Sequence, residues 1–235
     1  MAKKNKEISS SNLIKVKPIT EGQKSVFETW KKGQNQFLFG CAGTGKTFIS
    51  LYLAMQDVLD LKKKYDIVIL VRSLIPTREI GFLPGDEEDK AALYQVPYQN
   101  MVKFMFEQPN EQAFNMLYDR LKNQGSLYFL STSFLRGLTF DNSIIIVDEC
   151  QNLNFHELDT ITTRVGQDSK IVFCGDFSQT DLLKQNEKNG LHDFLRILME
   201  MQEFNCVEFN IGDIVRSGFV RNYLIQKTKL GMGME

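Results

Sequence analysis

One eight-residue run constrains the fold of this chain more than any other feature. The run fits the pattern G-x-x-x-x-G-K-[ST], in which a glycine-rich turn presents backbone N–H groups to phosphate oxygens. Residues 36–39 have the apolar pattern of a strand and residues 47–61 that of a helix, so the turn is expected to join the two. The N-terminus of such a helix attracts anions. The run consists of Gly40, Cys41, Ala42, Gly43, Thr44, Gly45, Lys46 and Thr47.

The residue types in this run predict a binding site for a nucleoside triphosphate and Mg²⁺. Gly43 and Gly45 allow backbone torsions and close approaches that a side chain would prevent. We expect Lys46 to reach the β- and γ-phosphates and the Thr47 hydroxyl to ligate Mg²⁺. The alternative is a turn that binds nothing, but the four fixed positions match by chance in about one chain of this length in a hundred.

A second motif follows about 100 residues later, where a strongly apolar strand ends in two acids. Residues 144–147 are β-branched and predict a buried strand, and Asp148 and Glu149 come directly after it. We expect Asp148 to hold the Mg²⁺ shell through water. Glu149 points in a different direction and is expected to orient or deprotonate the attacking water. The alternative is that the two acids only keep the strand end soluble.

Two glutamines are further candidates for contact with the nucleotide. The side-chain amide of Gln23 has the donors and acceptor that complement the N6 and N7 edge of adenine, although the bare sequence favours a solvent-facing glutamine. Gln179 lies just past the carboxyl end of a predicted strand at residues 170–174. From there it is expected to contact the γ-phosphate and the attacking water, as glutamines do in other P-loop enzymes.

Composition excludes several classes of protein. The chain has 235 residues, of which 43% are hydrophobic and 24% charged, the balance of an ordinary globular protein. Its formal net charge of −1 gives no global signature of nucleic-acid binding, but a local basic face is compatible with it. The apolar runs are far shorter than the ~18 residues that span a membrane, so no membrane association is expected.

Four scattered cysteines lack the C-x-x-C spacing of a zinc site. Three of them, Cys41, Cys150 and Cys174, lie in or beside motifs that we expect to be buried. Reduced core cysteines of this kind are typical of a cytoplasmic protein.

Helical and apolar stretches alternate along the chain, which predicts an α/β fold with a mostly parallel sheet flanked by helices. Lysine- and serine-rich residues 1–17 and residues 229–235 are expected to be flexible tails on a domain at 18–228. A helical insertion is expected at about 74–125. Other helices are expected at about 23–32, 154–163, 190–202 and 213–227, and other strands at 66–72, 127–130 and 206–209.

Many aromatic and methionine side chains lie in the predicted helices of the insertion, at 89–106 and 111–121. Such a stripe is typical of a core or a subunit interface, and it is less often a platform on which bases stack. Both interpretations stay open at this point. The stripe consists of Tyr94, Tyr98, Met101, Phe104, Met105, Phe106, Phe114, Met116 and Tyr118.

Taken in order, the motifs resemble the PhoH family of P-loop ATPases, which are similar to the first motor domain of superfamily-one helicases. The resemblance covers roughly residues 18–226. Cys150 stands where the family usually has alanine and Ser73 where it usually has proline, and neither change removes a phosphate or metal ligand. The motifs are Gln23, residues 40–47, Val71-Arg72, residues 81–86 (GFLPGD), residues 148–152 (DECQN), Gly175-Asp176 with Gln179 and Asp181, and residues 214–217 (IVRS).

The resemblance implies a single RecA-like domain that hydrolyses ATP with Mg²⁺. From the small size of the chain we expect a stand-alone form, such as phages encode. It assigns adenine recognition to Gln23, phosphate and Mg²⁺ contacts to Lys46 and Thr47, and γ-phosphate sensing to Gln179. Asp148 and Glu149 keep the roles that the residues themselves indicate.

A single domain of this type leaves ATP on an open face. Helicases of this kind close ATP between two RecA-like domains, and an arginine from the second supplies about 10³ to 10⁵ in rate. We therefore expect a homo-oligomeric ring, a hexamer as the family implies, with Arg216 as the first candidate for that arginine. Action of Arg216 in cis and its pairing with Asp213 at a helix start are the alternatives. Rival arginines are Arg72, Arg136 and Arg164.

Two functions remain in competition. The helicase-like motifs favour an ATP-driven motor on single-stranded RNA or DNA. The near-neutral composition favours an ATPase switch or assembly factor that acts on a protein partner without nucleic acid. A nuclease is not expected, because the chain lacks a clustered acid set separate from the ATP motifs.

Overall fold

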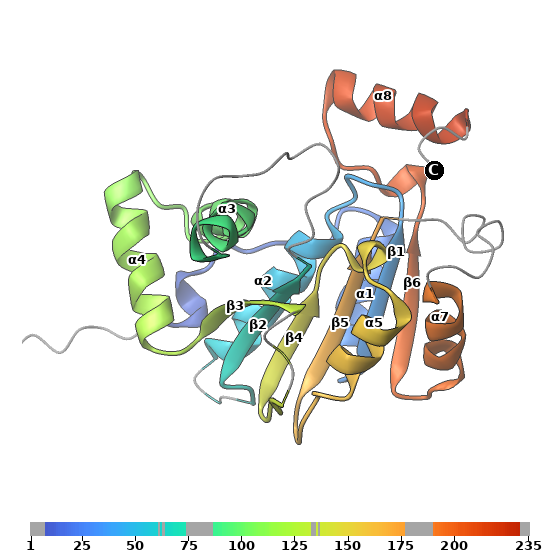
Figure 1. The fold of residues 1–235 in the computed structure, drawn as a ribbon. Helices are drawn as coiled ribbons and strands as arrows, with labels where there is room; N and C mark the ends of the chain where they lie inside the picture. Colours follow the sequence, from blue (N-terminus) through green and yellow to red (C-terminus); the bar gives the residue numbers. More distant parts are fainter. Residues whose placement is uncertain are drawn as a thin grey trace, which may run out of the picture.

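A computed structural model describes residues 8–60, 62, 64–73, 87–132, 135, 137–176 and 190–230 of the chain. Within these residues, six parallel strands form one sheet in the order β3-β2-β4-β5-β1-β6, with helices on both faces (Figure 1). The predicted α/β architecture is therefore confirmed. The strands are β1 (Asn35–Gly40), β2 (Ile67–Arg72), β3 (Leu127–Ser131), β4 (Ser143–Val147), β5 (Lys170–Gly175) and β6 (Phe204–Phe209).

The helices begin where capping residues hold their first N–H groups. Thr20 accepts from the N–H of Gln23, and Asn154 accepts from the N–H of Glu157, so both are N-caps. Asn110 plays the same part for the second helix of the insertion. The α-helices are α1 (Glu21–Lys31), α2 (Lys46–Val58), α3 (Glu87–Met105), α4 (Glu111–Asn123), α5 (Phe155–Thr162), α7 (Leu191–Glu200) and α8 (Gly218–Lys229). Short 3₁₀ turns are η1 (Ser10–Asn12), η3 (Cys150–Asn152) and η4 (Ile211–Asp213).

The sheet separates two hydrophobic cores because successive side chains of a strand point to opposite faces. In β4, Ile144 and Ile146 pack under α1, α2 and the insertion helices. Ile145 and Val147 pack on the other face, where α5 and α7 cover the sheet. Strands that supply both cores must be apolar throughout, which explains the uninterrupted runs in the sequence.

Parallel strands also bring their carboxyl ends to one edge of the sheet. The glycine turn follows β1, Arg72 ends β2, Asp148 follows β4 and Asp176 follows β5. This edge is where ligands bind in open α/β sheets.

Residues 8–17 are not a flexible tail, and this corrects the sequence-based expectation. Ile8 and Leu13 are buried in the core beside α2. The Ile14 N–H donates to the Met105 carbonyl at 2.8 Å, and the Tyr52 hydroxyl donates to the Ile14 carbonyl. The segment has only four apolar residues, Ile8, Leu13, Ile14 and Val16, too few to define a helical or strand pattern, so only its packing reveals its place.

The last helix begins later than its sequence predicts. The expected start was residue 213, but η4 ends there and an extended connector of residues 214–217 precedes α8 at Gly218. No residue of α8 is buried, and the helix stands above the carboxyl edge of the sheet (Figure 1).

The predicted helical insertion between β2 and β3 is found as α3 and α4. Its preceding segment, residues 74–86 with the GFLPGD motif, lies outside the described residues. Among the helices that the structure describes, none combines the length and the apolarity needed to cross a membrane.

Lys170 at the start of β5 is an unusual core residue, because only 2% of its side chain is exposed. Its ammonium lies 4.1 Å from the ring centroid of Trp30 and donates to the Trp30 carbonyl at 3.2 Å. Burial lowers the pKa of Lys170 from 10.5 to about 8, although the charge of Asp57 opposes the shift.

Replacement of this amine should remove a pH dependence of stability. Between pH 8 and 10.5 the unfolded chain binds more protons at Lys170 than the folded chain, so the folded state gains stability as pH rises. Urea unfolding at pH 7 to 10.5 should therefore show the free energy of unfolding of wild type rising relative to that of Lys170→Met across this window. The exposed Lys31→Met variant is the control and should run parallel to wild type. A constant difference between wild type and Lys170→Met would contradict the prediction.

Candidate nucleotide-binding site

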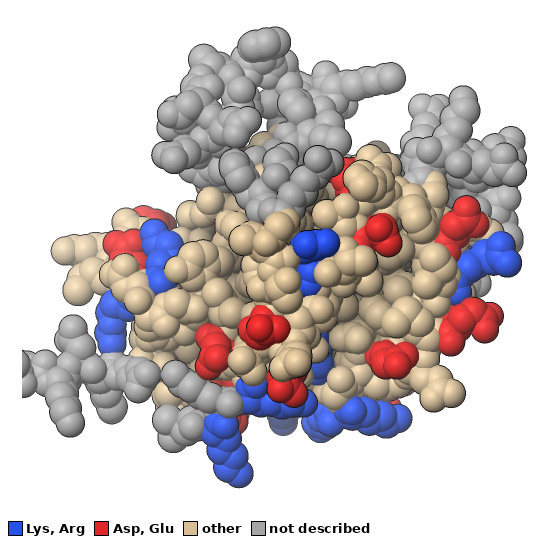
Figure 2. Space-filling view, turned by 60° about the horizontal axis from the view of Figure 1, so that its bottom comes forward, with Lys and Arg blue, Asp and Glu red and all other residues tan. Residues whose placement is uncertain are grey.

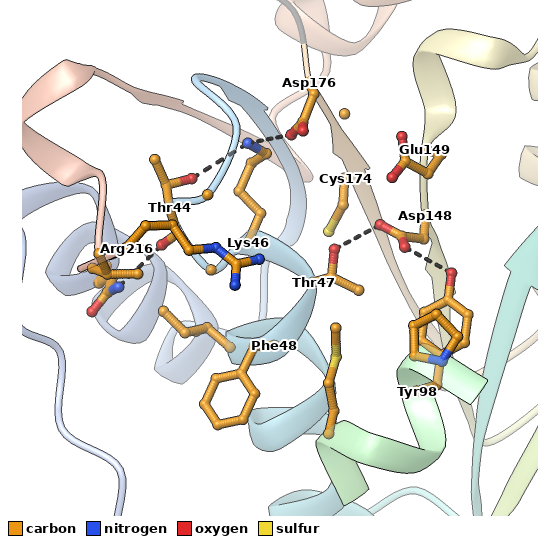
Figure 3. A pocket seen from close by; sticks show the side chains of 18 of the residues that line it. Thr44, Lys46, Thr47, Phe48, Tyr98, Asp148, Glu149, Cys174, Asp176 and Arg216 are labelled. Carbon is orange, nitrogen blue, oxygen red and sulfur yellow. Dashed lines mark hydrogen bonds and ion pairs between the residues drawn. The ribbon is translucent and has the colours of Figure 1, made fainter. Parts of the chain in front are cut away.

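A pocket of about 630 Å³ opens at the carboxyl edge of the sheet, over the N-terminus of α2 (Figure 3). Its volume lies within the range of about 300–1,000 Å³ that is typical of small-molecule sites. Its walls come from the glycine turn, three strand ends, α3 and the connector before α8. The residues predicted for the nucleotide site and the candidate arginines that line it are Gln23, Gly43, Thr44, Gly45, Lys46, Thr47, Arg72, Asp148, Glu149 and Arg216.

The glycine turn has backbone geometry that side chains disfavour. Gly43 has φ 73° and Gly45 has φ 87°, and Gly45 is the N-cap of α2. The first part of the turn, Gly40 to Ala42, joins β1 to the pocket but does not line it. There the Cys41 N–H donates to the Phe209 carbonyl of β6 at 2.8 Å. The turn is therefore held from the neighbouring strand while its second half faces the pocket.

Lys46 places its positive charge against the glycine turn. Its ammonium donates to the carbonyls of Cys41 at 2.8 Å and Gly40 at 3.3 Å, and forms an ion pair with Asp176 at 2.7 Å. Only 5% of Lys46 is exposed, so Asp176 balances a charge that is largely removed from water. Asp176 was part of a sequence motif but was not predicted as a site residue.

Thr47 and Asp148 meet across the pocket, although 101 residues separate them in the chain. The Thr47 hydroxyl donates to Asp148 Oδ1 at 2.6 Å, and the Tyr98 hydroxyl donates to Oδ2 at 2.7 Å (Figure 3). A hydroxyl beside a carboxylate is a donor set that fits Mg²⁺, which prefers oxygen and takes its remaining ligands from phosphate and water. The described residues contain no cluster of three or more His, Cys, Asp or Glu side chains that would hold a metal without such help.

Glu149 follows Asp148 with a backbone φ of 54°, in the left-handed region. Gln151 donates to Glu149 Oε2 at 2.6 Å and accepts from the Asp176 N–H at 3.1 Å, so it links the ends of β4 and β5. Burial raises the pKa of Glu149, and the charges of Asp148 and Asp176 raise it further. A carboxylate with a raised pKa is a better proton acceptor near neutral pH.

Tyr98 is a residue of this site that the sequence did not identify. It was expected in a core or interface, and it is buried with 2% exposure, but its hydroxyl reaches Asp148. Burial raises the pKa of Tyr98, as does the neighbouring Asp148 charge, so the phenol stays protonated and donates. The sequence signal was weak: a buried tyrosine usually finds a hydrogen-bond partner, but the partner depends on the fold.

Gln23 is not solvent-facing, which corrects the interpretation that the bare sequence favoured. It is 5% exposed and lines the pocket from the first turn of α1. Its Oε1 accepts from the Ile19 N–H at 2.9 Å, and its Nε2 donates to the Thr44 carbonyl at 3.1 Å. Each end of the amide keeps capacity for one more hydrogen bond, which is what an adenine edge requires.

Arg216 lies in the pocket of its own chain. Figure 3 shows its side chain reaching in beside Lys46. The Val215 N–H donates to the Gly43 carbonyl at 3.1 Å, which ties the connector to the turn. Arg216 is not at a helix start, and Asp213 accepts instead from the N–H groups of Gly22 and Asn210.

The other predicted residues lie elsewhere. Arg72 lines the pocket, where it donates to the Tyr98 hydroxyl at 3.5 Å. Arg164 bonds to the Leu138 carbonyl near the loop that precedes β4, at the opposite edge of the sheet. Arg136, Gln179 and Asp181 fall outside the described residues. Cys150 and Cys174 are buried as expected, whereas Cys41 is partly exposed.

Gly40 should tolerate no side chain, because β6 passes too close. A Cβ built there would lie 2.1 Å from the Phe209 carbonyl oxygen, and φ is 121°. We expect Gly40→Ala to lower the free energy of unfolding by about 2–5 kcal/mol, measured by urea denaturation. Gly125→Ala is the control, since Gly125 also has positive φ but no atom within 4 Å of the added Cβ. Its cost should be about 1 kcal/mol, and equal losses in the two variants would refute the close contact.

Comparison with known proteins assigns this chain to a family. A family model described as "PhoH-like protein" matches residues 15–226. A PhoH-like protein of Synechocystis sp. (strain ATCC 27184 / PCC 6803 / Kazusa) is 32% identical over 207 residues, which cover 88% of this chain and 60% of that protein. Protein PhoH of Escherichia coli (strain K12) is 31% identical over 206 residues, covering 87% of this chain and 56% of that protein. The chain thus spans no more than 60% of the length of these two relatives.

Among solved structures, the large terminase from a thermophilic bacteriophage has a similar fold. It aligns with a TM-score of 0.52 and 12% identity over 90% of this chain and 50% of that one. At this identity the likeness concerns the fold alone, which is the predicted RecA-like P-loop type.

Proposed function

Because this chain belongs to the PhoH family, we propose that it binds ATP with Mg²⁺ at the carboxyl edge of its sheet and hydrolyses the terminal phosphate. One observation carries the proposal: the Thr47–Asp148 hydrogen bond lies beside Lys46 at the N-terminus of α2. This arrangement presents a hydroxyl, a carboxylate and an ammonium to one pocket, as a metal-bound triphosphate requires.

In this proposal the glycine turn holds the phosphates. The backbone N–H groups of residues 43–47 and the N-terminus of α2 supply partial positive charge. Lys46 adds a full charge, and its ion pair with Asp176 keeps it at the turn. Gln23, with one donor and one acceptor to spare, would bind the adenine edge.

Thr47 and Asp148 would hold Mg²⁺. When bound, Mg²⁺ would neutralise charge on the phosphate oxygens during transfer. Glu149 would orient and deprotonate the attacking water, and Gln151 would keep its carboxylate in place. Gln179 remains the predicted γ-phosphate sensor.

The first test separates binding from hydrolysis. Glu149→Gln should lower kcat about 10²- to 10⁴-fold with nucleotide affinity retained, because the group removed acts on water. Lys46→Ala should lose nucleotide affinity as well. The exposed Glu200→Gln on α7 is the matched control. For wild type, kcat plotted against pH should fall on the acidic side at a pH above ~4.3, the ordinary glutamate pKa. The reason is that burial raises the pKa of Glu149. Wild-type turnover by Glu149→Gln would refute its role.

We further propose a homo-oligomeric ring, a hexamer as in the sequence-based expectation. The position of Arg216 in its own pocket supports action in cis. A mixture of Lys46→Ala and Arg216→Ala proteins should then stay inactive, because each pocket retains its own defect. Recovered ATPase activity would instead mean that Arg216 acts on a neighbouring subunit. A parallel mixture with Arg164→Ala in place of Arg216→Ala is the control, because Arg164 lies at the opposite edge of the sheet. Light scattering gives the mass of each assembly.

For the substrate, we propose single-stranded RNA or DNA, as the helicase-like motifs indicate. The alternative, a protein partner, draws support from the charge distribution. On the face shown in Figure 2, several basic side chains lie along the lower edge, and acidic and basic side chains are mixed over the rest.

Salt dependence discriminates the two substrates. Stimulation of hydrolysis by single-stranded RNA or DNA should fall steeply as salt rises, because phosphate contacts release counterions. Rates that stay unchanged with both polymers at every salt concentration would favour the protein partner.

A further inference from the structure

We propose that Tyr98 of α3 is a positioning residue for the Mg²⁺ site, and that it makes the helical insertion part of the nucleotide pocket. Its hydroxyl holds the Asp148 carboxylate in the orientation that serves the metal. The inference rests on the proposed binding of Mg²⁺ and nucleotide by Thr47 and Asp148.

The two oxygens of Asp148 have different partners. Oδ1 accepts from the Thr47 hydroxyl at 2.6 Å, and Oδ2 accepts from the Tyr98 hydroxyl at 2.7 Å. The second bond stops the carboxylate from rotating about its own axis and exchanging its oxygens. A carboxylate held in this way binds a metal without first losing rotational freedom, which is the general role of groups that bond to metal ligands.

Tyr98 is itself held in place. Its side chain is 2% exposed, and its ring lies 5.8 Å from the ring of Phe129 on β3. Arg72, at the end of β2, donates to the phenol oxygen at 3.5 Å. A fixed ring on a packed helix delivers the hydroxyl to one point in space, which a mobile surface tyrosine would not do.

The position of Tyr98 in the chain gives this contact its significance. Thr47 belongs to α2 and Asp148 directly follows β4, whereas Tyr98 comes from the insertion between β2 and β3. Val102 and Met105, further along α3, are fully buried in the core beside α2. The insertion is therefore anchored to the domain at one end of α3 and bonded to the proposed metal ligand at Tyr98.

The experiment compares the effect of Mg²⁺ on nucleotide binding in two tyrosine variants. Tyr98→Phe removes the hydroxyl and keeps the ring against Phe129. Tyr52→Phe is the control, because Tyr52 is equally buried and its hydroxyl also makes two hydrogen bonds, to Val16 and Ile14. Fluorescent ADP is titrated in Mg²⁺ and in EDTA, and Mn²⁺ binding in the presence of ADP is followed by electron paramagnetic resonance.

We expect Tyr98→Phe to reduce the gain in ADP affinity that Mg²⁺ provides, and to weaken Mn²⁺ binding, by about 10- to 100-fold. Affinity in EDTA should not change, and Tyr52→Phe should match wild type in both conditions. In an Asp148→Asn background, Tyr98→Phe should cause no further loss, because it acts through the carboxylate. An added loss there, or an unchanged Mg²⁺ gain in Tyr98→Phe, would overturn the proposal.

The outcomes also separate this inference from the proposed function. If wild type binds ADP equally well in Mg²⁺ and EDTA, the Mg²⁺ site itself is refuted and the role of Tyr98 falls with it. If wild type shows the Mg²⁺ gain and Asp148→Asn loses it while Tyr98→Phe keeps it, the site stands and only the positioning role is wrong.

Discussion

The hydrogen bond between Thr47 and Asp148 joins the two halves of the pocket, and the rest of the site is arranged around it. It links the first turn of α2 to the end of β4, which are distant in the chain but adjacent at the carboxyl edge of the sheet. The parallel arrangement of β1, β5 and β4 makes this meeting possible, because all three strands end on the same side. A hydroxyl and a carboxylate at that point form the donor pair that a hard cation requires.

The pocket gathers three carboxylates, and each has a distinct partner. Asp148 accepts from two hydroxyls, Glu149 accepts from the Gln151 amide, and Asp176 pairs with the Lys46 ammonium. Burial raises the pKa of Glu149, and repulsion from the charges of Asp148 and Asp176 raises it further. Different partners place chemically identical groups in different environments, which suits the separate tasks proposed for them: metal binding, water activation and lysine positioning.

Much of the fold and of the candidate site was predictable from the sequence where the local residue pattern agrees with the tertiary structure. The two motifs at residues 40–47 and 148–149 come at the ends of buried strands. The apolar runs of these strands predict both the strand and its end, so placing the motifs required no long-range information. The predictions failed where packing alone decides. Residues 8–17 have no periodic pattern yet lie on the core, and the connector before α8 is tied to the glycine turn by a backbone bond from Val215 to Gly43. Gln179 and the GFLPGD motif lie outside the described residues.

The sequence by itself determined the family, the α/β class and the residue types of a phosphate-binding turn, because such a turn needs particular glycines, a lysine and a hydroxyl in one short run. The tertiary structure decided which distant side chains complete the site. Tyr98 reaches Asp148, Asp176 pairs with Lys46 and Arg216 enters its own pocket because the sheet order and the insertion bring them there. Such contacts depend on the spatial order of strands, which no local pattern of residues encodes.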